Sequence, residues 1–186
     1  MLAVLVLALI VVAVVLARPK SSTPRSAELS KSSVAAALAG SPAPLASLHS
    51  QSNQLLPGGT GAFKARLAQV KGRPVVINEW ASWCEPCQSE FPVFQRVAVR
   101  YGRQVAFIGV DSRDSSSAAA AFLRRFPVSY PSYVDHSQNI GRSMQAVGGI
   151  PQTVYVNRRG KQVFDHAGPY ETVGSLERDI RRYVLQ

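Results

Sequence analysis

Residues 75–87 read VVINEWASWCEPC, and this stretch holds the only two cysteines of the 186-residue chain, Cys84 and Cys87. An apolar run, Val75 to Ile77, precedes the cysteines, and a helical pattern follows them. If the run is a strand and a helix begins near Cys84, that sulfur lies at a helix N-terminus, where unpaired N–H groups favour a thiolate. Because the thiolate is the form that attacks disulfides, the pattern predicts redox chemistry.

Three other roles of the cysteine pair are open. A structural disulfide would close a ring of only four residues and would stabilise the fold little. A structural zinc site needs four ligands, and the three histidines, His49, His136 and His166, are scattered singly. Two inert buried thiols fit any fold, but Pro86 between the cysteines and Trp83 beside them indicate a shaped turn.

The first 17 residues, Met1 to Ala17, carry no polar side chain. A run of this length is at the lower limit for a tilted membrane helix, so we expect a membrane anchor or a signal peptide. No Lys or Arg precedes the run, which favours the anchor. Arg18, Lys20 and Arg25 follow it, and the positive-inside rule alone would keep this flank in the cytoplasm.

The next segment, residues 18–46, is rich in Ser, Pro and Ala and has few large apolar side chains. Such a composition predicts a flexible tether, with a short helix over residues 33–38 as the alternative. We therefore expect one folded domain over residues 47–186.

The formal net charge is +10. A basic surface can meet acidic partners or anionic lipid headgroups. The basic residues are dispersed singly or in pairs, without the interleaved aromatic pattern of a single-strand binder, so we expect no nucleic-acid partner.

Strand and helix patterns alternate after the tether, which predicts an α/β fold built in layers. Residues 55–61 carry turn residues, Pro92 should interrupt or kink its helix, and residues 157–160 should form a hairpin turn with Gly160 at positive φ. We expect helices over residues 63–70, 84–101, 115–126, 140–147 and 175–184, and strands over 75–78, 105–110, 130–134, 153–156 and 162–164.

From about Ser47 to its end, the chain resembles the membrane-anchored, thioredoxin-like thiol–disulfide oxidoreductases of bacteria, the TlpA/ResA/DsbE-like family. The motifs that carry the resemblance are residues 75–78 leading into residues 80–87, then Glu90 and Pro92, and finally residues 149–153 (GIPQT).

The resemblance implies a thioredoxin fold, with a central mixed β-sheet flanked by helices. It further implies that Pro151 is cis and faces the cysteines, and that the backbone at Ile150 pairs with substrate. The resemblance also implies that the domain lies on the outer side of the cell membrane.

Two residues depart from cytoplasmic thioredoxins. Asn78 stands where those proteins carry a buried Asp, and it cannot accept a proton from Cys87. Glu90, about one helical turn after Cys87, matches the acid that similar anchored proteins keep near the cysteines, although a solvated helix carboxylate is the alternative. Glu79 replaces a common apolar residue, and we interpret it as a half-exposed strand residue.

We assign Cys84 as the exposed nucleophile and Cys87 as the thiol that resolves the mixed disulfide, with Trp83 and Pro86 shaping the surface around them. No metal and no organic cofactor is implied. The expected partners are proteins carrying disulfides or dithiols, a redox protein that donates or accepts electrons, and the membrane through residues 1–17.

The direction of electron flow is a separate hypothesis. Glu79, Glu85 and Glu90 are near the cysteines in sequence, and no Lys, Arg or His lies between Pro74 and Phe91. The local charge should oppose the thiolate, so we expect a reductant of protein disulfides, for example in cytochrome c maturation. The alternatives are an oxidase of exported proteins and a copper-handling module that uses both thiolates with His136 or His166.

Overall fold

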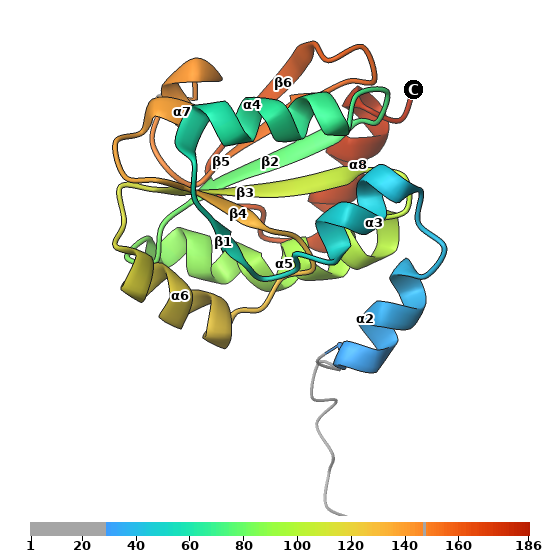
Figure 1. Ribbon diagram of the computed structural model, residues 1–186, viewed down its shortest axis with the longest axis horizontal. Helices are drawn as coiled ribbons and strands as arrows, with labels where there is room; N and C mark the ends of the chain where they lie inside the picture. Colours follow the sequence, from blue (N-terminus) through green and yellow to red (C-terminus); the bar gives the residue numbers. More distant parts are fainter. Residues whose placement is uncertain (1–28, 147) are drawn as a thin grey trace, which may run out of the picture.

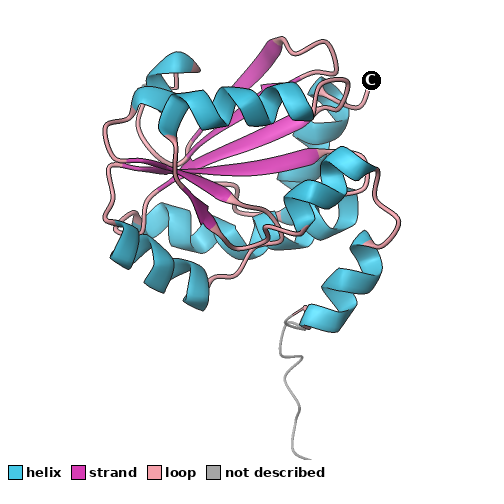
Figure 2. Ribbon diagram, in the orientation of Figure 1, coloured by secondary structure: helices cyan, strands magenta, loops and turns pink. Residues whose placement is uncertain are grey.

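The computed structural model describes residues 29–146 and 148–186. A six-stranded sheet runs through this part of the chain, with helices on both faces (Figures 1 and 2). The expected membrane segment, residues 1–17, lies outside the described residues, and no helix within them is both long and apolar enough to span a bilayer. The elements in chain order are α2 (Lys31–Leu38), α3 (Ala43–His49), β1 (Leu55–Leu56), α4 (Gly59–Gln69), β2 (Val75–Trp80), α5 (Glu85–Tyr101), β3 (Ala106–Ser112), α6 (Ser116–Arg125), β4 (Ser132–Asp135), α7 (Asn139–Ser143), β5 (Gln152–Val156), β6 (Gln162–Ala167) and α8 (Val173–Tyr183).

The sheet is mixed, as expected, with the strand order β1-β4-β3-β2-β5-β6. Strands β1 to β4 run parallel to one another, whereas β5 is antiparallel to β2 and β6 is antiparallel to β5. Every residue of β2 is buried, because this strand has a neighbour on each side and helices on both faces. The cysteine stretch therefore leaves from a central strand of the fold.

Alternation along β2 divides the core into two layers. Val76 and Trp80 face the layer that contains α5, α6 and α8, and both cysteines belong to this layer. Val75 and Ile77 face the opposite layer, under α3, α4 and α7. The register also requires Gly109 on β3, because a Cβ there would lie 2.1 Å from the Ser132 hydroxyl oxygen.

The expected flexible tether over 18–46 is wrong for its second half, because α2 and the start of α3 lie within it. The short-helix alternative at residues 33–38 is confirmed by α2, whose N-cap Ser30 accepts a hydrogen bond from the Ser33 N–H at 3.1 Å. Composition misled here because a few spaced leucines, Leu38, Leu45 and Leu48, are buried against the domain.

Other boundaries differ from the sequence expectation in informative ways. The segment expected to be only a turn contains β1, a two-residue strand that pairs with β4. Helix α5 continues through Pro92 as one element, so the expected interruption there is wrong. The hairpin expectation is confirmed: β5 and β6 pair antiparallel, and Gly160 has φ of 80°.

Candidate functional site

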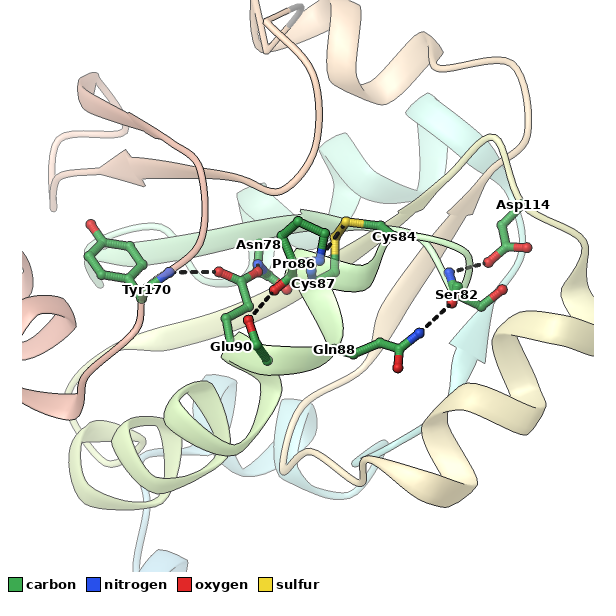
Figure 3. Close-up of a disulfide and its surroundings, with 10 residues drawn as sticks. Asn78, Ser82, Cys84, Pro86, Cys87, Gln88, Glu90, Asp114 and Tyr170 are labelled. Atoms are coloured by element: carbon green, nitrogen blue, oxygen red, sulfur yellow. Dashed lines mark hydrogen bonds between the residues drawn. A yellow bond between two sulfur atoms is a disulfide. The ribbon is translucent and has the colours of Figure 1, made fainter.

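The two cysteines lie at the start of α5 and are joined in a disulfide with an S–S distance of 2.04 Å (Figure 3). Cys84 is the N-cap of the helix, and its sulfur accepts a hydrogen bond from the Cys87 N–H at 3.2 Å. Of the two side chains, Cys84 is 4% exposed and Cys87 is fully buried. The helix N-terminus thus stabilises negative charge on the sulfur that solvent reaches more easily.

A buried carboxyl group lies one helical turn after Cys87. Glu90 Oε1 accepts a hydrogen bond from Asn78 Nδ2 at 2.6 Å, and Oε2 accepts one from the Tyr170 N–H at 3.1 Å (Figure 3). Glu90 is completely buried, so the alternative of a solvated helix carboxylate is wrong. Burial raises the pKa of Glu90 to about 7, against the lowering effect of the two hydrogen bonds. A carboxyl group in this range can hold or release a proton near neutral pH.

The rim of the site combines exposed and buried residues. Trp83 is 57% exposed, although it is a large apolar side chain, and Pro86 is exposed beside it. The Ile150–Pro151 peptide bond is cis, as the family resemblance implies. Ile150 packs against the apolar cluster that includes both cysteines. Large exposed aromatic surface beside a disulfide is suited to contact with another protein.

The charges around the site differ from the sequence interpretation. Glu79 is completely buried, not half-exposed, and accepts a hydrogen bond from the Ser112 hydroxyl at 2.5 Å. Burial raises the pKa values of Glu79 and Glu90, so these two carboxyl groups oppose a thiolate less than full charges would. Glu85 is the exposed acid in the first turn of α5.

Sequence reasoning also missed a cation and two acids that the end of β3 and the β3–α6 loop bring near the site. The Arg113 guanidinium carbon lies 5.9 Å from the Trp83 ring centroid, and the Trp83 indole N–H donates to the Arg113 carbonyl oxygen at 3.1 Å. Asp114 accepts a hydrogen bond from the Ser82 N–H at 2.6 Å, and Asp111 is buried nearby at the end of β3. These residues lie at or just after the end of β3. Their place next to the cysteines could have been predicted, because the C-terminal ends of the parallel neighbours β2 and β3 meet at one edge of the sheet.

The histidines considered as metal ligands have other neighbours. His136 Nδ1 lies 2.6 Å from the Asp114 carbonyl oxygen, and the His166 ring stacks on Tyr170 with centroids 4.0 Å apart. In the part of the chain that the structure describes, no three or more His, Cys, Asp and Glu side chains are grouped to hold a metal ion.

The chain is similar in sequence and in fold to known proteins. A model of the AhpC/TSA family matches residues 40–163. The thiol–disulfide oxidoreductase ResA of Bacillus subtilis is 30% identical over 105 residues, covering 56% of this chain and 58% of its own length. The thiol:disulfide interchange protein DsbE of Pseudomonas fluorescens is 31% identical over 94 residues, covering 50% of this chain and 51% of its own. The match thus spans little more than half of these relatives.

A solved structure agrees with the architecture. The crystal structure of a putative thiol:disulfide interchange protein DsbE from Chlorobium tepidum superposes with a TM-score of 0.58 and 26% sequence identity, over 62% of this chain and 83% of that chain. The likeness confirms the expected thioredoxin-like arrangement, a mixed sheet with helices on both faces.

Proposed function

Because the chain belongs to the AhpC/TSA family, we propose that it is a thiol–disulfide oxidoreductase that reduces protein disulfides outside the cytoplasm. The observation that carries the proposal is the Cys84–Cys87 disulfide at the N-terminus of α5. The names of the relatives, ResA and DsbE thiol–disulfide proteins, support the same class of reaction.

The reaction begins from the dithiol form. The Cys84 thiolate attacks one sulfur of a substrate disulfide, so a bond forms between Cys84 and that sulfur while the second substrate sulfur leaves and takes up a proton. Cys87 then loses its proton and attacks the Cys84 sulfur, which releases the first substrate sulfur as a thiol. Two electrons have passed to the substrate, and the protein is left with its internal disulfide. A donor dithiol protein restores the starting form.

Glu90 is the acid–base group that we assign to the resolving step. It lies on the same helix one turn after Cys87, and its raised pKa of about 7 fits a proton acceptor at neutral pH. Asn78 occupies the strand position below the cysteines but has no titratable group, so it orients the Glu90 carboxyl group through its hydrogen bond.

Substrate contact is assigned to the rim. The exposed ring of Trp83 and the exposed Pro86 offer apolar surface to a protein substrate, and the backbone at Ile150, beside the cis Pro151, pairs with its extended chain. Because this contact is made through backbone hydrogen bonds, it allows substrates with many different sequences to bind.

The proposed location is the outer face of the cell membrane, with residues 1–17 as the anchor. Their apolar composition supports this, and the expected partners are exported proteins, among them apocytochrome c, and a membrane redox protein that supplies electrons. Helix α2 begins at Lys31, within the segment 18–46 that was expected to be a tether.

The reduction potential of the cysteine pair tests the direction. A reductant should lie toward the thioredoxin value of roughly −270 mV, and a value near −120 mV, at the strongly oxidising end, would instead favour the oxidase of exported proteins. Insulin reduction measured beside a copper titration tests the class of function. We expect turnover without stoichiometric copper binding, and copper binding without turnover would overturn the proposal. Cys84→Ala serves as the inactive control.

A further inference from the structure

Helices α2 and α5 border a groove at the end of α5 that is remote from the cysteines. Helix α2 packs against the C-terminal end of α5 (Figure 1). The contact is close, because Leu38 is buried and a Cβ on Gly102 would lie 2.7 Å from Leu38 Cδ2. The groove beside this contact has a volume of about 1000 Å³, and it is lined by residues of α2, of the α2–α3 link, of α5 and of the start of α8.

One wall of the groove is basic. Arg96, Arg100 and Arg103 follow one another at intervals of four and three residues, so they share one face of the helix and of the residues just after it. Arg103 reaches across the groove, where its Nη2 would lie 3.6 Å from a Cβ on Gly40 of the α2–α3 link.

Two of these arginines have no acidic partner. Arg100 is bonded to Glu177, whereas Arg96 and Arg103 form no ion pair in the part of the chain that the structure describes. None of the described residues that line the groove is acidic. Two exposed guanidinium groups are therefore available to bind an anion.

The remaining surface of the groove is largely apolar. Val99 and Val173 line it, and Leu29, which is 38% exposed, lies where the chain enters α2. Guanidinium groups bind phosphate oxygens in pairs, and apolar side chains favour hydrocarbon. The groove thus fits an amphipathic anion, in which a phosphate is joined to hydrocarbon, better than a fully hydrated ion or an acidic peptide.

The groove also lies near the segment that we expect to enter the membrane. Residues 18–28 connect the apolar run, which ends at Ala17, to Leu29. A chain of this length spans at most about 40 Å, so an anchor formed by residues 1–17 keeps the groove within that distance of the bilayer surface. Anionic lipid headgroups at such a surface attract arginine side chains.

We propose that the groove binds the headgroup of an anionic phospholipid and thereby holds the domain in one orientation at the membrane. Arg96 and Arg103 bind the phosphate, while Leu29 and Val99 contact the adjoining hydrocarbon. The cysteines are then held away from the bilayer, because Cys84 precedes Arg96 by twelve residues, or roughly 18 Å of helix. The inference rests on the proposed membrane location but not on the thiol chemistry.

Two double variants test the role of the unpaired arginines. Arg96→Gln/Arg103→Gln removes both of them and leaves Arg100 in its ion pair. Arg158→Gln/Arg159→Gln is the matched control, because it removes two exposed arginines from the β5–β6 turn, which does not line the groove. Both variants should unfold at the same urea concentration as the unsubstituted protein, since all four side chains are exposed.

The first readout is lipid retention by the full chain in a neutral detergent. The chain is titrated with an equimolar mixture of phosphatidylglycerol and phosphatidylcholine, and the bound lipid is identified by native mass spectrometry. The unsubstituted chain and the control should retain phosphatidylglycerol in preference. Arg96→Gln/Arg103→Gln should bind it about 25-fold more weakly, at about fivefold for each arginine.

The comparison between variants removes the effect of other charges. Arg18, Lys20 and Arg25 are present in every protein, so their attraction for the lipid is the same in each. Equal retention of phosphatidylglycerol by all three proteins, or equal retention of the two lipids by the unsubstituted chain, would overturn the proposal.

Competition at constant ionic strength separates the lipid from other anions. Phosphatidylglycerol should stay bound in an excess of inorganic phosphate or of polyglutamate, because neither has hydrocarbon to place against the apolar surface. Release by inorganic phosphate would show a site for a free anion, and release by polyglutamate would show a site for an acidic protein. Either result would overturn the proposal.

The second readout is amide hydrogen exchange of the full chain in nanodiscs, which tests the orientation. Residues 39–41, beside the groove, should exchange more slowly in nanodiscs that contain phosphatidylglycerol than in nanodiscs of phosphatidylcholine alone. Ser82 and Trp83 should exchange equally in both. The difference at residues 39–41 should disappear in Arg96→Gln/Arg103→Gln and persist in the control.

Slower exchange at Trp83 in place of residues 39–41 would overturn the proposed orientation. If the full chain does not enter nanodiscs at all, the proposed membrane location fails, and lipid retention in detergent still decides whether the groove binds the headgroup.

Discussion

Replacing Glu90 with glutamine should remove a large part of the pH dependence of folding stability. The buried carboxyl group has two donors, Asn78 Nδ2 and the Tyr170 N–H. In Glu90→Gln, the side-chain oxygen keeps the Tyr170 bond. The introduced amide donates to Asn78 Oδ1, which has no hydrogen-bond partner among the described residues, once Asn78 turns its amide over. The turn exchanges one unpartnered atom of Asn78 for the other, Oδ1 for Nδ2, so the substitution does not add to the number of buried polar atoms without a partner.

The magnitude follows from the shift in the Glu90 pKa. In the folded protein this pKa is raised from 4.5 to about 7, so the proton binds more tightly in the folded state than in the unfolded state. The corresponding stability is fully present below pH 4.5 and is lost as the pH rises through 7. Each pKa unit is worth about 1.4 kcal/mol, so the carboxyl group lowers the free energy of unfolding by about 3 kcal/mol across this range.

The assay is urea unfolding of the oxidised protein and of Glu90→Gln from pH 4 to pH 8. Glu79 and Asp111, whose pKa values are also raised by burial, are present in both proteins, so the difference between the two curves isolates Glu90. As the pH rises, the free energy of unfolding of Glu90→Gln should increase by about 3 kcal/mol relative to that of the unsubstituted protein. For the control Glu85→Gln, at an exposed position of the same helix, the difference in unfolding free energy from the unsubstituted protein should change with pH by less than about 1 kcal/mol. Parallel curves for Glu90→Gln would refute the reasoning.

Three further substitutions test the packing around the site by chemical denaturation. Gly109→Ala should destabilise the fold by roughly 1–3 kcal/mol, because the new methyl group would overlap the Ser132 hydroxyl, and unchanged stability would show that this register is looser than described. Phe122→Ala should cost about 3–5 kcal/mol, since the ring contacts three other aromatic rings, and a cost below 1 kcal/mol would contradict that packing. Glu177→Gln should cost less than about 1 kcal/mol, because its partner Arg100 is largely exposed, and a larger loss would show a stronger ion pair.

The sequence predicted those parts of the fold that depend on local pattern. The apolar run before Cys84 forms β2, the helical pattern after it forms α5, and Gly160 takes positive φ in the β5–β6 hairpin. Each of these depends on residues within a few positions of one another. The cis bond before Pro151 was available only through the family resemblance, since a proline alone does not select that isomer.

The parts that the sequence did not predict depend on contacts between distant segments. Helices α2 and α3 form in a segment of tether-like composition because their leucines are buried against the domain. Glu79 was expected at a half-exposed position, but α7 covers it: a Cβ at Gly141 would lie 2.7 Å from its carboxylate. Asp111 and Asp114 reach the cysteine loop only because β3 lies beside β2.

The order of the two cysteines in the reaction is the central claim, and trapping the mixed disulfide tests it most directly. Cys84→Ser and Cys87→Ser are reduced, incubated with disulfide-bonded insulin and analysed by intact mass under non-reducing conditions. We predict that Cys87→Ser accumulates an insulin adduct on Cys84, because that sulfur is at the helix N-terminus and is the more accessible of the two, while Cys84→Ser forms none. An adduct that forms on Cys84→Ser as fast as on Cys87→Ser would contradict the account.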